Sequence, residues 1–229
     1  MQFEKPKMNI KAVIFDLDGV LVNTDEFHYQ AWKELADELG IPFDRNINER
    51  LRGVSRMESL EVILEQSAKN FTQQEKMLLT DKKNERYRAL LNDLSADDVL
   101  PGVISFINNL NRINIKMAIG SSSKNAPLIL EKTSLDSLFD VVIDGNQISR
   151  SKPHPEVFLK AAQQLGEKPE ACLVVEDADA GVEAALRAGM SVLAVGAAAS
   201  NPKVHFAASN LIEFIGQIPK NSFKSKHII

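Results

Sequence analysis

The sequence predicts an α/β fold in which a parallel sheet with flanking helices carries an all-helical insertion after its first strand. From residue 100 onward, short apolar runs alternate with amphipathic helical segments, a pattern typical of parallel strands joined by right-handed crossovers. Residues 41–99 instead carry apolar residues at helical spacing, with no strand pattern between them. Because one strand-like run, residues 12–15, precedes this helical block, we interpret the block as an insertion into the α/β domain.

The composition is that of an ordinary globular protein. The chain has 229 residues, of which 44% are hydrophobic and 25% charged, enough to bury a core without a disulfide. Its net charge of −4 argues against nucleic-acid binding, and its lone Cys172 fits a reducing compartment. No apolar run reaches the roughly 18 residues of a membrane span, and residues 1–11 lack the apolar stretch of a signal peptide. We therefore expect a cytoplasmic protein that binds neither nucleic acid nor membrane, and we expect a monomer.

The first strand runs directly into two carboxylates. The apolar run 12–15 suits a strand buried on both faces, and Asp16 and Asp18 follow at its carboxyl end, where open α/β sheets bind ligands. Gly19 then allows a sharp turn of the backbone. Two carboxylates this close repel each other unless a cation lies between them. The pattern indicates a Mg²⁺ site with a nucleophilic aspartate; a plain strand followed by an acidic turn is the alternative.

A helix is predicted over residues 25–39, with an apolar residue at every fourth position and a stop at Gly40. A second row on this helix is also spaced by four, and it consists of Thr24, His28 and Trp32. These three side chains should share one face of the helix, close to the acidic turn. For His28, a catalytic role and a histidine that is solvated or satisfied by a neighbour both fit this position.

The helical block contains three further predicted segments, near residues 45–51, 57–68 and 73–91. Between the first two lies Arg52-Gly53-Val54-Ser55-Arg56, in which a glycine and a hydroxyl between two arginines can cradle an anion at a helix start. A plain helix-helix turn with solvated arginines is the alternative. In the third segment, Lys82-Lys83-Asn84 predicts a solvated, charged helix face.

The rest of the chain alternates between strands and helices. The expected elements are a helix from Pro101-Gly102 to 110, a strand over 113–119, a helix from about 126 to 138, a strand over 141–143, a helix over 155–165, a strand over 173–175, a helix over 178–188, a strand over 191–195, and a last strand and helix near 206 and 211–215. Residues 219–227 are expected to form a frayed basic tail.

Polar residues follow four of the strands. They are Asp16 and Asp18, then Ser121, then Lys152 in the loop after the third strand, then Glu176-Asp177. Parallel strands deliver such groups to one edge of the sheet, and this set suits phosphoryl transfer. Carboxylates of Asp16 and Asp177 can hold Mg²⁺, while the Ser121 hydroxyl and Lys152 can hold phosphate oxygens. One carboxylate can accept the phosphoryl group as an aspartyl phosphate, and Asp18 is placed as general acid and base.

These motifs resemble the haloacid dehalogenase (HAD) superfamily and, within it, the β-phosphoglucomutase family. The superfamily signature runs from Phe15-Asp16-Leu17-Asp18-Gly19 through Ser121 and Lys152-Pro153 to Glu176-Asp177, and the subfamily markers are residues 24–32, 53–60, 83–84 and 123–127. The resemblance implies a Rossmann-like core domain formed by residues 1–24 and 92–229, with a helical cap domain over residues 25–91.

The resemblance also implies a role for each matching position. Asp16 would be the nucleophile, Asp18 the general acid/base, Lys152 a catalytic phosphate ligand, and His28 the link between sugar binding and the position of Asp18. One Mg²⁺ would be held by Asp16, the backbone carbonyl of Asp18, Glu176 and Asp177. Arg56 would hold the phosphate at the far end of the substrate. The substrate- and phosphate-binding positions would be Thr24, Trp32, Gly53, Val54, Ser55, Arg56, Ser59, Lys83, Ser121, Ser122, Ser123, Lys124 and Asn125.

The implied reaction is a Mg²⁺-dependent conversion of β-D-glucose 1-phosphate into glucose 6-phosphate, through phosphorylated Asp16 and a β-glucose 1,6-bisphosphate intermediate. The bisphosphate or another phosphoryl donor would activate the enzyme, and a small phosphorylated sugar would be its partner. A HAD-type sugar-phosphate phosphatase uses the same core with water as the acceptor and is the alternative. A non-catalytic sugar-phosphate sensor is disfavoured because Asp16, Asp18, Lys152 and Asp177 are all present.

Overall fold

The computed structural model describes residues 9–215, so the predicted tail at 219–227 lies outside it. Its strands form one six-stranded sheet in the order β3-β2-β1-β4-β5-β6, and every neighbouring pair is parallel. The strands are β1 (Ala12–Phe15), β2 (Lys116–Gly120), β3 (Val141–Ile143), β4 (Cys172–Glu176), β5 (Ser191–Ala194) and β6 (Phe206–Ala207). The α/β fold with helices inserted after the first strand is confirmed.

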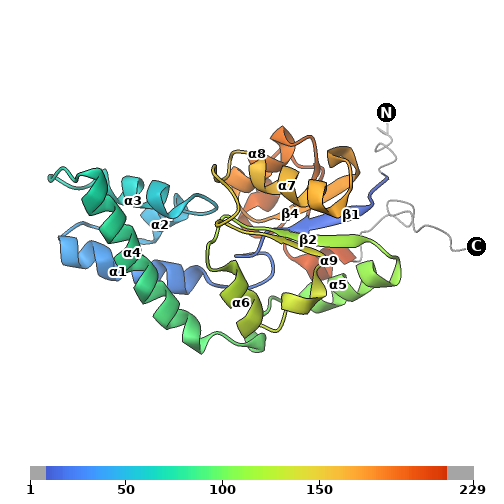
Figure 1. Ribbon diagram of the computed structural model, residues 1–229, viewed down its shortest axis with the longest axis horizontal. Coiled ribbons are helices and arrows are strands. Elements are labelled where there is room, and N and C mark those ends of the chain that lie inside the picture. The colour runs from blue at the N-terminus through green and yellow to red at the C-terminus, as the bar shows by residue number, and fades with distance from the viewer. Residues whose placement is uncertain (1–8, 216–229) are drawn as a thin grey trace, which may run out of the picture.

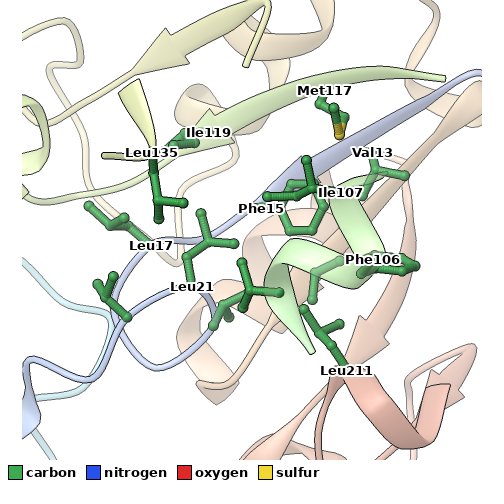
Figure 2. Close-up of a cluster of buried hydrophobic side chains, with 14 of the residues drawn as sticks. Val13, Phe15, Leu17, Leu21, Phe106, Ile107, Met117, Ile119, Leu135 and Leu211 are labelled. Atoms are coloured by element: carbon green, nitrogen blue, oxygen red, sulfur yellow. The ribbon is translucent and has the colours of Figure 1, made fainter. Parts of the chain in front are cut away.

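Helices cover both faces of the sheet, as Figure 1 shows. They are α5 (Val103–Arg112), α6 (Ala126–Lys132), α7 (Glu156–Leu165), α8 (Asp179–Arg187) and α9 (Leu211–Ile215). Successive strand side chains point to opposite faces, so Val13 and Phe15 pack with α5, α6 and α9 while Ala12 and Ile14 pack with α7 and α8. Figure 2 shows the first of these cores, where Phe15 lies beside Phe106 of α5.

The helical insertion, residues 25–91, lies beyond the carboxyl ends of the strands and packs around its own apolar core (Figure 1). Its helices are α1 (Asp25–Leu39), α2 (Arg45–Glu49), α3 (Arg56–Leu64) and α4 (Gln73–Leu90). Capping boxes begin α3 at Ser55 and α4 at Thr72. The α3 helix ends at Leu64, earlier than the expected residue 68, and the Ser67 hydroxyl accepts a hydrogen bond from the backbone N–H of Lys69 in the turn that follows.

The two chain segments that join the helical insertion to the sheet run side by side. Val22 and Val99 form an antiparallel bridge. The backbone N–H of Leu100 donates to the carbonyl of Leu21 at 2.9 Å, and that of Asn23 donates to the carbonyl of Asp98 at 3.3 Å. The insertion is therefore attached through a paired double linker rather than through two independent tethers.

Five short 3₁₀ helices complete the described fold. They are Leu91–Asp93, Ala96–Asp98, Asp136–Leu138, Pro169–Ala171 and Gly196–Ser200. Within residues 9–215, none of the helices combines the length and apolar character needed to cross a bilayer.

Two predicted element boundaries were wrong for the same reason. The strand expected over 113–119 begins only at Lys116, because Asn114 adopts a left-handed backbone with φ of 52°. The helix expected to reach residue 138 ends at Lys132, and Ser134 is left-handed with φ of 58°. Glycine is the usual left-handed residue and asparagine the next, so Asn114 carried a weak sequence signal and Ser134 carried none.

Candidate active site

The carboxyl ends of the strands and the facing side of the helical insertion enclose a cavity of about 390 Å³. The predicted site residues that line it are Asp16, Asp18, His28, Trp32, Gly53, Val54, Ser55, Arg56, Ser59, Lys83, Ser121, Ser122, Ser123, Lys124, Asn125, Lys152 and Asp177. Thr24 and Glu176 lie behind this wall, and both are fully buried. The structure thus brings the predicted residues together around one cavity, with Thr24 and Glu176 directly behind the residues that line it.

Three carboxylates form a compact cluster at the end of β1 and β4. One oxygen each from Asp16, Glu176 and Asp177 lies within 4.8 Å of the other two. Two glycines leave room for the cluster: a Cβ on Gly19, whose φ is +82°, would lie 2.1 Å from Asp177 Oδ2, and a Cβ on Gly181 would lie 1.7 Å from Glu176 Oε1. Gly181 was not predicted as a site residue.

Lys152 neutralises part of this acidic cluster. Its Nζ lies 2.5 Å from Asp16 Oδ1 and 2.5 Å from Glu176 Oε1. Burial lowers the pKa of Lys152, but Asp16 and Glu176 outweigh burial and hold that pKa above its usual value. The other oxygen of Glu176 accepts hydrogen bonds from the backbone N–H groups of Asp177 and Ala178, at 2.8 and 3.0 Å. Lys152 therefore keeps its positive charge inside the protein, and both Glu176 oxygens have hydrogen-bond partners.

The donor set fits a hard divalent cation. Burial raises the pKa of Asp16 to about 6, with the Glu176 charge adding to burial and Lys152 opposing it. Burial, Glu176 and Asp16 together raise the pKa of Asp177 to about 9, against the opposing charge of Arg52. These shifts express the cost of crowding buried anions, which a cation among them would relieve. Oxygen donors of this kind are the ligands that Mg²⁺ prefers.

Asp18 lies next to the cluster and is held by Thr24, whose hydroxyl donates a hydrogen bond to Asp18 Oδ1. Burial and the nearby Asp16 charge raise the pKa of Asp18 to about 7. A carboxyl group with such a pKa can both give and take a proton near neutral pH, as a general acid/base must.

Lys83 is almost fully buried, whereas the charge pattern of its helix predicted a solvated face. Its Nζ lies 2.9 Å from His28 Nδ1, and it lies 4.5 Å from the ring centroid of Tyr87 and 4.9 Å from that of Trp32. Burial lowers the pKa of Lys83, and burial together with the Lys83 and Arg56 charges lowers the pKa of His28. Lys83 thus places its desolvated Nζ at the cavity wall, close to two aromatic rings and to His28.

The two arginines of the predicted anion cradle have different environments. Arg56 begins α3 and lines the cavity, and its side chain makes no hydrogen bond or salt bridge to any residue between 9 and 215. Burial lowers its pKa, so its guanidinium is partly desolvated. Arg52 instead pairs with carboxylates, including Asp177, so of these two arginines Arg56 alone presents an unpaired guanidinium to the cavity in the described structure.

The loop after β2 is shaped by its own serines. Ser121 Oγ accepts from the backbone N–H of Ser123 at 3.0 Å, and Ser123 Oγ accepts from that of Asn125 at 3.2 Å. The Asn125 side chain contacts the helical insertion: its amide donates to Asn84 Oδ1 at 2.8 Å, and Arg88 Nη1 donates to its oxygen at 3.4 Å. Arg88 was not among the site residues predicted from the sequence, although its spacing of four from Asn84 places both residues on one face of α4.

A parallel sheet whose strand ends gather an acidic cluster, a serine loop and a buried lysine defines the HAD class of phosphotransferases. The chain belongs to the haloacid dehalogenase-like hydrolase family, whose family model matches residues 10–189.

Within this family the chain is a homologue of β-phosphoglucomutase. It is 44% identical to β-phosphoglucomutase of Bacillus subtilis (strain 168) over 189 residues, which cover 82% of this chain and 84% of that protein. A crystal structure of β-phosphoglucomutase from Clostridium difficile matches with a TM-score of 0.84 and 37% identity, covering 91% of this chain and 96% of that chain. The phosphorylated carbohydrates phosphatase of Thermotoga maritima is 31% identical over 188 residues, 79% of this chain and 82% of that protein. The resemblance inferred from the motifs is confirmed.

Proposed function

We propose that this protein is a Mg²⁺-dependent β-phosphoglucomutase that converts β-D-glucose 1-phosphate into glucose 6-phosphate. The observation that carries the proposal is Arg56, a cavity-lining guanidinium with no protein hydrogen-bond partner among the described residues, which faces a site already equipped for one phosphoryl group. A mutase must hold a phosphate at both ends of its bisphosphate intermediate, whereas a phosphatase needs only one phosphate site. The 44% identity to the Bacillus subtilis enzyme supports the same substrate.

The proposed metal site consists of Asp16, Asp177 and the backbone carbonyl of Asp18, with Glu176 beside them. Bound Mg²⁺ would supply positive charge to the phosphoryl oxygens during transfer. Lys152, already 2.5 Å from Asp16, adds a second positive charge at the same place. The serine loop at residues 121–123 offers hydroxyl and backbone N–H donors for the remaining phosphoryl oxygens.

The reaction then uses Asp16 and Asp18 in turn. Asp16 Oδ accepts a phosphoryl group from β-glucose 1,6-bisphosphate or another donor, forming an aspartyl phosphate. When β-glucose 1-phosphate binds with its phosphate on Arg56, Asp18 takes the proton of the sugar 6-hydroxyl as that oxygen attacks phosphorus. The bisphosphate then reorients within the site, so that its 1-phosphoryl group faces Asp16. That group passes to Asp16, and Asp18 returns the proton to the departing oxygen. Glucose 6-phosphate leaves, and Asp16 is again phosphorylated.

We propose that the helical insertion acts as a cap domain over a core formed by residues 1–24 and 92–229. In the described structure it contacts the core on both sides of the cavity, through Arg52 at Asp177 and through Asn84 at Asn125. Such coverage would keep water from phosphorylated Asp16 while a sugar hydroxyl is presented to it. The proposal also includes a cytoplasmic location and a monomeric enzyme whose partner is a small phosphorylated sugar.

In the decisive experiment, the protein is incubated with β-glucose 1-phosphate, Mg²⁺ and a trace of β-glucose 1,6-bisphosphate, and the phosphorylated products are monitored by phosphorus NMR. We expect glucose 6-phosphate to form without a matching rise in inorganic phosphate. Inorganic phosphate as the main product would instead establish a phosphatase, the function of the Thermotoga maritima relative. The Asp16→Asn variant serves as the control for contaminating activities.

Truncating Arg56 should separate the two phosphate sites. We expect Arg56→Ala to lower kcat/KM for β-glucose 1-phosphate roughly 10- to 100-fold, the usual loss of a hydrogen bond to a charged group. Phosphorylation of Asp16 by acetyl phosphate, which has no distal phosphate, should change little. Arg50→Ala is a matched control, because Arg50 pairs with Glu65 on the exposed surface. Equal losses in turnover of β-glucose 1-phosphate and in Asp16 phosphorylation by acetyl phosphate would show that Arg56 does not hold the distal phosphate.

A further inference from the structure

Arg52 is a charged residue of the cavity that the proposed reaction does not use. Its guanidinium makes three ion pairs: Nη2 lies 2.5 Å from Asp25 Oδ2, Nε lies 2.8 Å from Glu49 Oε2, and Nη1 lies 3.2 Å from Asp177 Oδ2. Asp25 and Glu49 belong to the helical insertion, whereas Asp177 follows β4 of the sheet. Arg52 therefore connects the insertion to a carboxylate of the acidic cluster.

The surroundings of Arg52 fix this contact in place. Asp25 and Glu49 hold two edges of the guanidinium, so that its Nη1 edge faces Asp177. The next residue, Gly53, has a φ of +74°, and a Cβ there would lie 3.2 Å from the Cβ of Ala178. The backbone of the insertion thus approaches the core closely beside the ion pair. The Arg52 side chain is 26% exposed and that of Asp177 is 9% exposed, so solvent weakens the pair only in part.

We propose that Arg52 and Mg²⁺ compete for Asp177, so that metal binding and closure of the helical insertion through Arg52 oppose each other. The inference rests on the metal site of the proposed function. An oxygen that accepts a hydrogen bond from a guanidinium is a poorer metal ligand, and two cations that share one carboxylate repel each other. Coupling between two binding events is reciprocal, so bound metal weakens the Arg52 contact as much as Arg52 weakens metal binding.

This competition makes closure depend on the substrate. With metal at Asp177, bringing Arg52 back beside it costs electrostatic energy. The negative charge of a phosphorylated sugar or of phosphorylated Asp16 offsets that cost, because the anion lies among both cations. The helical insertion then closes firmly over a metal-loaded site only when a phosphoryl group is present. Arg52 is thus a positioning residue for the insertion and not a group that reacts.

The test is the Mg²⁺ affinity of the sugar-free enzyme, measured by calorimetric titration of protein freed of metal with EDTA and dialysed. We expect Arg52→Gln to bind Mg²⁺ about five to ten times more tightly than wild type, a typical size for such coupling. Arg52→Lys, which keeps the charge, should remain close to wild type. Arg50→Gln removes the same charge two residues away, where the Arg50 side chain pairs with Glu65 alone among residues 9–215, and its affinity should also remain close to wild type.

A second readout follows the helical insertion itself. Small-angle X-ray scattering of wild type should show a larger radius of gyration when Mg²⁺ is added, and metal-free Arg52→Gln should already be as expanded. A purely structural role for Arg52 would lower the melting temperature of Arg52→Gln and leave its Mg²⁺ affinity unchanged, and this result would overturn the proposal. Weaker Mg²⁺ binding by Arg52→Gln would overturn it too.

If wild type bound no Mg²⁺, both the proposed metal site and the proposed competition would be wrong. If Asp177→Asn abolished Mg²⁺ binding while Arg52→Gln left Mg²⁺ affinity unchanged, the metal site would stand and only the competition would be wrong.

Discussion

Replacing Asp16 by asparagine should abolish mutase turnover, with kcat falling by roughly 10⁴-fold or more, as when a catalytic nucleophile is removed. An amide oxygen is a poor nucleophile and cannot form the aspartyl phosphate that carries the phosphoryl group. The fold should survive, because Lys152 keeps its contact with Glu176 at 2.5 Å when the Asp16 charge is lost. Far-ultraviolet circular dichroism and the melting temperature check this point.

The measurement is phosphate incorporation from acetyl phosphate, read by intact mass spectrometry, together with turnover of β-glucose 1-phosphate. Wild type should gain one phosphoryl group and Asp16→Asn none. Asp179→Asn is the matched control, since Asp179 is exposed at the start of α8 and hydrogen-bonded to Asn201. Near wild-type turnover in Asp16→Asn would contradict the covalent mechanism.

Replacing Asp18 by asparagine should slow transfer to the sugar by about 10²- to 10⁴-fold, the usual contribution of a general acid/base. The asparagine can still accept the Thr24 hydrogen bond, so the geometry of the site should persist. Phosphorylation of Asp16 by acetyl phosphate should be much less affected, because the acetate that leaves needs no proton. The two reactions therefore separate proton transfer from phosphoryl transfer.

Rapid-quench kinetics can measure both steps in the same preparation. The rate of Asp16 phosphorylation by acetyl phosphate comes first, and the rate of transfer to β-glucose 1-phosphate follows after the donor is removed. Equal slowing of both steps in Asp18→Asn would assign Asp18 to metal or phosphate binding instead of proton transfer. The Thr24→Val variant, which removes only the hydroxyl that holds Asp18, should lie between wild type and Asp18→Asn.

The parts of the site that sequence could predict are those encoded locally. Asp16 and Glu176 each stand at the end of an apolar run, and a parallel sheet brings such ends to one edge whatever the rest of the chain does. Their contact with Lys152 follows from the same topology. For these groups, identifying the strands was sufficient to place the chemistry.

Contacts between distant segments could not be predicted in this way. Arg52 and its partner Asp177 are 125 positions apart, and the sequence around Arg52 is equally compatible with an anion cradle. Lys83 lies in a charged stretch, and only the packing of α4 against α1 places its Nζ beside His28 and Trp32. Charge patterning describes one helix at a time, whereas burial depends on what packs against it.

The paired segments at Leu21–Asn23 and Asp98–Leu100 make the helical insertion comparable to a ligand tethered to its own receptor. A short tether gives an effective concentration on the order of millimolar or higher, because translation and most of rotation are already restricted. If the insertion opens and closes as proposed, a few polar contacts, such as that between Asn84 and Asn125, are enough to hold the closed arrangement and few enough to break during each turnover. The same residues expressed as a separate fragment would have to supply that concentration from solution, and would dock far more weakly.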